Sequence, residues 1–166
     1  MNKKNIFFAL AIFILVSCGA SSPSQGRVDI SDISRVNIPD REQGYSNLKD
    51  TVIHSRTELD LYLQSIKPQA GWNNKAAFVN GLQNEPVPFD LMNILIYFHT
   101  EGSGSIGVSL AEPVWEGGNA VIAITRTVPE IGTADMAYYA YAFTIKKTIP
   151  KVIFTIGDTS VEIISG

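Results

Sequence analysis

The sequence predicts an α+β domain in which one or two N-terminal helices pack on an antiparallel sheet, arranged as a β-meander or as a partial β-sandwich. Apolar residues recur at helical spacing from Leu59 to Ile66. Short segments rich in β-forming residues then follow one another at about ten-residue spacing between Met92 and Ile164, which is typical of antiparallel strands joined in order. Gly117 and Gly118 separate two of these segments and indicate a hairpin turn.

Residues 1–17 have the order of a bacterial lipoprotein signal peptide. Lys3 and Lys4 form a basic start, an apolar run covers residues 6–16, and Leu15-Val16-Ser17-Cys18 fits a lipobox. The run is about eleven residues long, whereas a spanning helix needs roughly 17–25. We therefore expect cleavage before Cys18 and attachment of a diacylglycerol and a further acyl chain to this cysteine, which would anchor the mature chain on a membrane surface. The alternative is an ordinary signal peptidase site that happens to contain a cysteine.

The residue after Cys18 bears on the destination. Gly19 stands where a retention signal would have Asp. By the general lipoprotein rule, this favours the outer membrane if the cell has two membranes. The expected location is the bacterial cell envelope.

The composition of residues 18–166 restricts what the domain can bind. This length suffices for one domain with a proper core. Loss of Lys3 and Lys4 with the signal peptide takes the formal charge from −3 to −5, so no basic field attracts nucleic acid. Cys18 is the only cysteine, and lipidation consumes it, so neither a disulfide nor a thiolate metal site is expected. We expect no cofactor.

Residues 18–47 are predicted to be a flexible tether, and residues 48–166 the globular domain. The stretch is rich in Ser, Asp, Arg, Gly and Gln, and its aliphatic residues are scattered. Such a composition buries too little apolar area to offset the entropy of ordering. The alternative is that Val28–Ile38 docks as an edge strand, because its apolar residues alternate for part of the way.

Two helices are predicted after a short strand at 51–54. Ser55-Arg56-Thr57-Glu58 has the form of a capping box, and Pro68 ends the helix that follows. Asn73 or Asn74 can cap the second helix, and Trp72 is expected to fill the space between helix and sheet. The apolar stripe of the first helix is Leu59, Tyr62, Leu63 and Ile66, and that of the second is Ala77, Phe78 and Leu82.

The remaining elements are predicted to be strands. The unbroken apolar run within residues 92–99 is typical of a strand buried on both faces. Residues 137–147 place Tyr139, Tyr141, Phe143 and Ile145 on one face, which we expect to pack under a helix. The other predicted strands are 105–110, 120–128, 152–156 and 161–164.

A meander brings alternate connections to the same end of the sheet. The segments Thr100–Gly104 and Pro129–Met136 should therefore be neighbours, with Lys146, Lys147 and Lys151 at the opposite end. We expect the first end to meet a protein partner, because it combines backbone-exposing glycines, apolar contacts and a carboxylate rim. The predicted partner-binding residues are Glu101, Gly102, Gly104, Glu130, Ile131, Gly132 and Asp135, with Met136 as a further apolar contact.

Other chemistries are open at the same end. His99, Glu101 and Asp135 could serve a hard cation or general acid–base catalysis, although no HxH, HExxH or DxDxDG spacing is present. Gly102-Ser103-Gly104-Ser105 does not have the form of a nucleophile elbow. Tyr138, and Trp115 beside the Gly117-Gly118 turn at the opposite end, are alternative platforms for a sugar ring or a protein. The sequence predicts no catalytic residue set and no metal ligands.

Several segments together resemble the PrcB-like protease-complex subunit domain family, over roughly residues 51–154. They are a capped Ser-x-x-Glu-Leu helix, Phe89-Asp90 before the apolar strand, the glycine-rich loop, the segment Val128-Pro129-Glu130-Ile131-Gly132, and an aromatic strand ending at Lys147. The family's glycine-rich loop often reads Thr-Gly-Gly-Tyr, and residues 100–105 here lack the aromatic. The resemblance implies a small bacterial lipoprotein that supports a surface or periplasmic protease complex.

The predicted function is that of a lipid-anchored, non-enzymatic accessory or binding module. One alternative is a lipoprotein that binds a glycan or a peptide. A third reading is a small hydrolase that uses His99 with a loop carboxylate.

Overall fold

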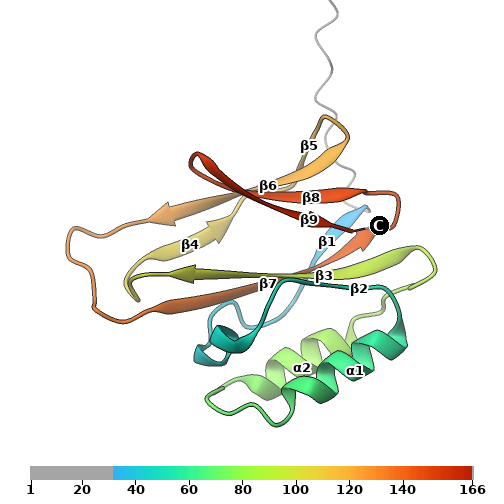
Figure 1. Ribbon diagram of the computed structural model, residues 1–166, viewed down its shortest axis with the longest axis horizontal. Coiled ribbons are helices and arrows are strands. Elements are labelled where there is room, and N and C mark those ends of the chain that lie inside the picture. Colours follow the sequence, from blue (N-terminus) through green and yellow to red (C-terminus); the bar gives the residue numbers. More distant parts are fainter. Residues whose placement is uncertain (1–31, 166) are drawn as a thin grey trace, which may run out of the picture.

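The computed structural model describes residues 32–165, which form an α+β fold, as predicted. Strands outnumber helices, and the two α-helices lie early in the described chain (Figure 1). The elements in chain order are β1 (Ile33–Val36), η1 (Gln43–Asn47), β2 (Thr51–Ile53), α1 (Arg56–Ile66), α2 (Lys75–Asn84), β3 (Met92–Glu101), β4 (Gly107–Leu110), β5 (Val114–Glu116), β6 (Asn119–Thr127), β7 (Ala137–Lys146), β8 (Lys151–Ile156) and β9 (Thr159–Ile164).

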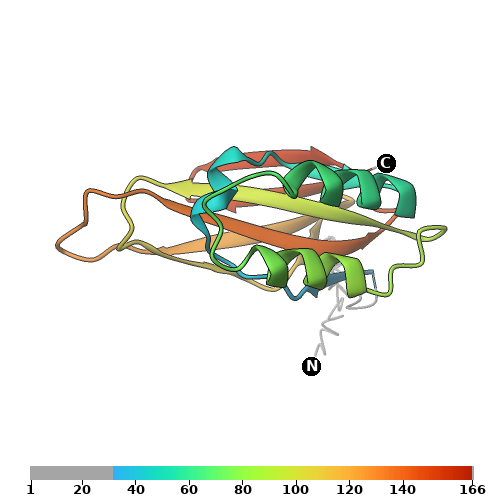
Figure 2. The same ribbon diagram turned by 90° about the horizontal axis from the view of Figure 1, so that it is seen from below.

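The strands form two sheets that face each other, and both helices cover the outer face of one of them (Figures 1 and 2). The first sheet has the order β1-β7-β3-β2, and the second has the order β4-β6-β8-β9 with β5 also paired to β6. This order differs from a meander, since β7 pairs with β3 and since β6 and β8 run parallel. The chain crosses to the second sheet between β3 and β4 and returns between β6 and β7.

The alternation of β7 explains how the two faces of the first sheet are used. Tyr139, Tyr141 and Phe143 belong to the core between the sheets, whereas Ala140 and Ala142 belong to the core under the helices. The expectation that the aromatic row packs under a helix is therefore wrong. Facing sheets lie about 10 Å apart and need large side chains to fill the gap, whereas small alanines let the helices approach closely.

The predicted tether is also wrong for residues 32–47, which belong to the domain. β1 pairs with β7, with Ile33 opposite Ile145. Val36, Ile38 and Tyr45 are buried in the core under the helices. The scattered aliphatic residues of this stretch thus complete an edge that β7 would otherwise leave open. Residues 18–31, the signal peptide and Cys18 lie outside the described residues.

Local signals position the helices. The capping box of α1 is confirmed on the Ser55 side, whose Oγ accepts a hydrogen bond from the Glu58 N–H (3.2 Å), and Glu58 Oε2 in turn accepts from the His54 N–H (2.8 Å). Trp72 packs edge-on against Tyr45 and Phe78, in agreement with the prediction that it fills space between helix and sheet. Ala77, predicted on the apolar face of α2, is exposed. Among residues 32–165, no helix is both long and apolar enough to cross a membrane.

Candidate functional site at the loop end

Two loops meet at one end of the molecule, which we call the loop end (residues 102–106 and 128–136). Glu101 pairs with Ala137 in the first sheet, and Gly107 pairs with Thr127 in the second. These two crossings between the sheets therefore occur at the same end, where the loops project beyond the strands (Figures 1 and 2), whereas the third crossing, from β7 to β8, lies at the other end. The predicted proximity of these segments is confirmed, although the two crossings produce it and not a meander.

Polar contacts hold the two loops together. The Thr133 N–H donates to Ser103 Oγ (2.9 Å), and Ser103 Oγ donates to the Thr133 carbonyl (2.9 Å). Ser105 Oγ lies 2.9 Å from Ser103 Oγ. Asp135 Oδ1 accepts from the Gly104 N–H (3.3 Å). The hydrogen bond of the Asp135 carboxylate with Thr133 is the main cause that lowers the pKa of Asp135, so this carboxylate is ionised near neutral pH.

Two of the predicted glycines are required by this close approach. A Cβ on Gly104 would lie 2.2 Å from Asp135 Oδ2, and a Cβ on Gly132 would lie 3.1 Å from Ser103 Oγ. Gly102 has open space around it. Gly104 and Gly132 therefore serve loop packing, while Gly102 exposes backbone.

Apolar side chains stand on the longer loop. Ile131 is 86% exposed, and Val128 and Met136 are also exposed. We call Val128, Ile131 and Met136 the apolar loop tip. Sequence reasoning identified Ile131 and Met136 and missed Val128, which it placed at the end of a strand. Glu130 is exposed beside the apolar loop tip.

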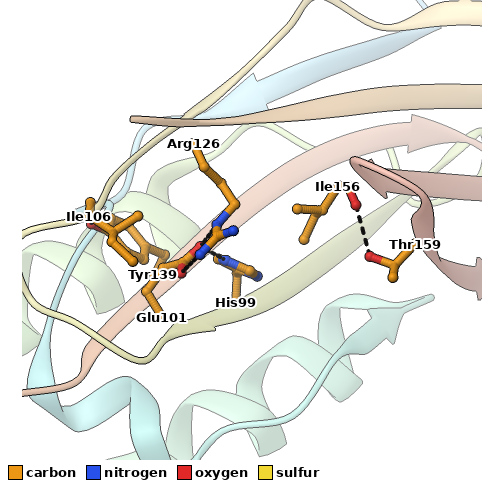
Figure 3. Close-up of polar contacts among 7 residues, drawn as sticks. All are labelled: His99, Glu101, Ile106, Arg126, Tyr139, Ile156 and Thr159. Carbon is orange, nitrogen blue, oxygen red and sulfur yellow. Dashed lines mark hydrogen bonds and ion pairs between the residues drawn. The ribbon is translucent and has the colours of Figure 1, made fainter. Parts of the chain in front are cut away.

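Glu101 is not part of an exposed rim, so this prediction is wrong. Its carboxylate is only 3% exposed and accepts one hydrogen bond from Arg126 Nε and another from Arg126 Nη2, each 2.7 Å long. His99 Nε2 lies 2.7 Å from Glu101 Oε1 (Figure 3). The hydrogen bonds from Arg126 are the largest cause that lowers the pKa of Glu101, and burial opposes them. The carboxylate rim is thus reduced to Glu130 and Asp135.

The cluster of His99, Glu101 and Arg126, in which the Glu101 carboxylate is buried and Arg126 is partly exposed, connects the two sheets. His99 and Glu101 lie on β3, and Arg126 lies on β6. Nearby, the Tyr139 hydroxyl donates to the Ile106 carbonyl (2.7 Å) and fixes the start of β4 over β7 (Figure 3). Arg126 is the residue that sequence reasoning missed. Arg126 lies between Thr125 and Thr127 at the polar end of β6, so local sequence does not distinguish it from an ordinary exposed strand residue.

The geometry gives little support to catalysis or metal binding at this cluster. Ser103 and Ser105 hydrogen-bond each other and Thr133, and in the described chain His99 bonds neither of them. Asp135 lies with Gly104 and does not join His99 and Glu101. Residues 32–165 hold no group of three His, Cys, Asp or Glu side chains placed to bind a metal ion.

The two aromatic platforms are partly covered. Trp115 packs against the core between the sheets, and Tyr138 packs against the core under the helices. Both are only partly exposed, whereas Ile131 is almost fully exposed. The apolar loop tip is therefore the better contact surface at this end.

Comparison of the chain with models of protein families, with curated proteins and with solved structures finds no match.

Proposed function

We propose that the chain is a lipid-anchored, non-enzymatic binding module of the bacterial cell envelope whose loop end contacts a protein partner. The observation that carries this proposal is Ile131, which is 86% exposed on a loop fixed by Ser103 and Asp135. Burial of a large apolar side chain from a loop that is already ordered costs little conformational entropy. The two carboxylates beside it, Glu130 and Asp135, favour a partner with Lys or Arg around an apolar pocket.

The path of the chain supports a role for this end. The described chain enters the fold beside Ile145, whereas one loop begins after Glu101 and the other ends before Ala137. From Ala137 to Ile145, β7 covers about 26 Å at 3.3 Å per residue. Cys18 and Asp32 are separated by residues 19–31, which reach at most about 50 Å. This reach exceeds the length of β7, so an anchor on Cys18 leaves the loop end free to face a partner without fixing the orientation of the domain.

The family resemblance suggests which partner this is. We propose a subunit of a surface or periplasmic protease complex, whose assembly or stability the module supports. The resemblance and the exposed Ile131 both support a protein contact as the module's role.

Copurification with a charge introduced at the apolar loop tip tests the proposal. Ile131→Asp should reduce the partner recovered with detergent-extracted protein at least tenfold, because a carboxylate is not accommodated in an apolar contact. Leu61→Asp is the matched control, since Leu61 is 59% exposed on α1, far from the loop end. Both variants should keep the wild-type denaturation midpoint. Undiminished recovery with Ile131→Asp would place the interface elsewhere.

A further inference from the structure

Among residues 32–165, β1 is an edge strand, and the backbone groups on its outer side have no hydrogen-bond partner there. The Lys146 N–H donates to the Asp32 carbonyl (2.8 Å), so alternate residues from Asp32 onward direct their backbone groups to β7. Ile33 and Arg35 lie between these residues, so their N–H and C=O groups point away from β7. Within residues 32–165, no strand pairs with that side of β1.

Cavities open on both faces of this edge. The helix-side cavity, about 560 Å³, lies between residues 37–39 and α2, with Asn80, Asn84 and Glu85 in its lining. The inter-sheet cavity, about 230 Å³, lies between β1 and the segment that joins β4 to β5. Its lining is mostly apolar and includes Ile33, Leu110, Pro113 and Phe143. A third cavity, about 410 Å³, extends along residues 35–40.

The three cavities together form a groove along residues 33–40, and close packing holds its walls in place. A Cβ on Gly81 would lie 2.3 Å from the Asn37 carbonyl oxygen, so α2 packs directly against the chain that follows β1. Pro39 lies beyond β1 and cannot donate to an added strand, which limits the open edge to a few residues.

We propose that the outer edge of β1 binds an extended peptide of a partner protein as an added antiparallel strand. Strand addition takes its affinity from main-chain hydrogen bonds and its specificity from pockets for alternate side chains. In the added strand, the residues opposite Ile33 and Arg35 bond β1 through their own backbone, and their side chains point to the inter-sheet cavity. The residues between them point to the helix-covered face of the sheet, on which the helix-side cavity lies just beyond the end of β1.

The linings of the two cavities define the peptide. The inter-sheet cavity fits an aliphatic side chain. Glu85 lines the helix-side cavity, Glu112 lines the inter-sheet cavity, and neither forms an ion pair in the described chain, whereas Arg35 is paired with Asp40 (2.5 Å). The groove is therefore acidic, and it favours a segment that alternates basic and aliphatic residues. This surface is separate from the loop end, so the inference does not depend on the proposed function.

A synthetic probe tests the backbone register directly. The probe is a fluorescein-labelled acetyl-(Lys-Val)₄-amide, titrated with detergent-solubilised full chain and followed by fluorescence anisotropy. We expect saturable binding below 1 mM. N-methylation of the valine amides, which should face β1, is expected to weaken binding at least tenfold. N-methylation of the lysine amides, which should face away, is expected to change it less than threefold.

Variants of the chain provide the second arm. Arg35→Pro removes an outward N–H without removing a bond to β7 and should weaken binding at least tenfold. Arg35→Ala keeps that N–H and should bind within threefold of wild type. Ser160→Pro is the matched control, because the bond from the Ser165 N–H to the Pro150 carbonyl places the Ser160 N–H on the outer side of β9.

Several results would overturn the proposal. They are the absence of binding up to 1 mM, equal binding of the two methylated probes, and unchanged binding by a folded Arg35→Pro variant. Dimerisation that Arg35→Pro abolishes would identify a second copy as the occupant. Binding that appears only after deletion of residues 19–31 would identify the chain's own segment. If Arg35→Pro fails to fold, the proposal is tested by the difference in affinity of the two methylated probes for the wild-type protein.

Discussion

Glu101 on β3 and Arg126 on β6 form a bidentate ion pair that joins the two sheets at the loop end. Both N–H donors of the guanidinium lie 2.7 Å from the carboxylate, which is buried, whereas the Arg126 side chain remains partly exposed. The planar fork of arginine fits a carboxylate in one orientation only. The pair therefore fixes the relative position of the strands from which both loops emerge.

The first prediction concerns the contribution of this pair to stability. Glu101→Gln should lower the free energy of unfolding by about 1.5–3 kcal/mol at pH 7, the range for a hydrogen bond to a charged group. Arg126 holds the pKa of Glu101 below its usual value. The contribution is therefore fully present above the unfolded pKa of roughly 4.3, and it is lost as the pH falls through the lower folded pKa.

Urea denaturation at pH 7 and pH 3 measures this effect. The difference between wild type and Glu101→Gln should shrink at pH 3. Glu130→Gln is the control, because Glu130 is exposed in the same part of the molecule and should have almost no effect at either pH. If the difference in the free energy of unfolding between wild type and Glu101→Gln is the same at both pH values, the packing of Glu101 and not its charge stabilises the fold.

Periodicity predicted the local structure of the strands but not their order. The runs within β3 and β7 and the hairpin at Gly117 and Gly118 follow from side-chain alternation and from the positive φ of both glycines (56° and 84°). The pairing of β3 with β7 skips three strands. Alternation shows that a face is apolar without showing whether a helix or a sheet covers it.

The same limit applies to the loop end. The expected meander placed the segments Thr100–Gly104 and Pro129–Met136 side by side, which is correct although the topology differs. The burial of Glu101 depends on Arg126, which lies in the other sheet, and local sequence carries no sign of that pairing. Residues 33–36 likewise form a strand because they pair with the edge of β7. The sequence of residues 33–36 alone does not show that this edge is available.

The second prediction concerns the core between the sheets. Phe143→Ala should cost about 3–5 kcal/mol, the range for deletion of a buried aromatic ring. Phe143 is buried and its ring centroid lies 6.0 Å from that of Phe154 in the facing sheet. Val161→Ala on the exposed part of β9 should cost less than about 1 kcal/mol and provides the control. Equal denaturation midpoints for the two variants would contradict the assignment of Phe143 to the core.

The third prediction concerns the membrane anchor. Cys18→Ala should abolish acylation, because the thioether sulfur is the attachment atom and the chain has no second cysteine. Intact mass and membrane fractionation measure the result. The denaturation midpoint of residues 32–165 should not change, since their core is built from side chains of the described residues and Cys18 lies outside them. A mutant that retains the lipid mass would exclude Cys18 as the anchor.

The fourth prediction follows from the cap of α2, which comes from a distant part of the chain. Asn74 is the N-cap residue, but its side chain makes no capping bond to the helix. Glu42, just before η1, supplies the acceptor. Its carboxylate accepts from the Asn73 N–H (3.1 Å) and the Asn74 N–H (3.0 Å), and also bonds the Asn74 side-chain amide.

A buried carboxylate at a helix N-terminus satisfies backbone donors and interacts favourably with the helix dipole. Glu42→Gln should therefore lower the free energy of unfolding by about 1–3 kcal/mol, since the amide has one acceptor oxygen and directs its NH₂ group at the donors. Glu85→Gln is the matched control, because Glu85 is the C-cap of the same helix, where a negative charge is unfavourable. That change should be neutral or slightly stabilising. Denaturation followed by tryptophan fluorescence reports on both variants, since Trp72 precedes the capped residues; equal effects of the two substitutions would show that Glu42 does not act as the cap.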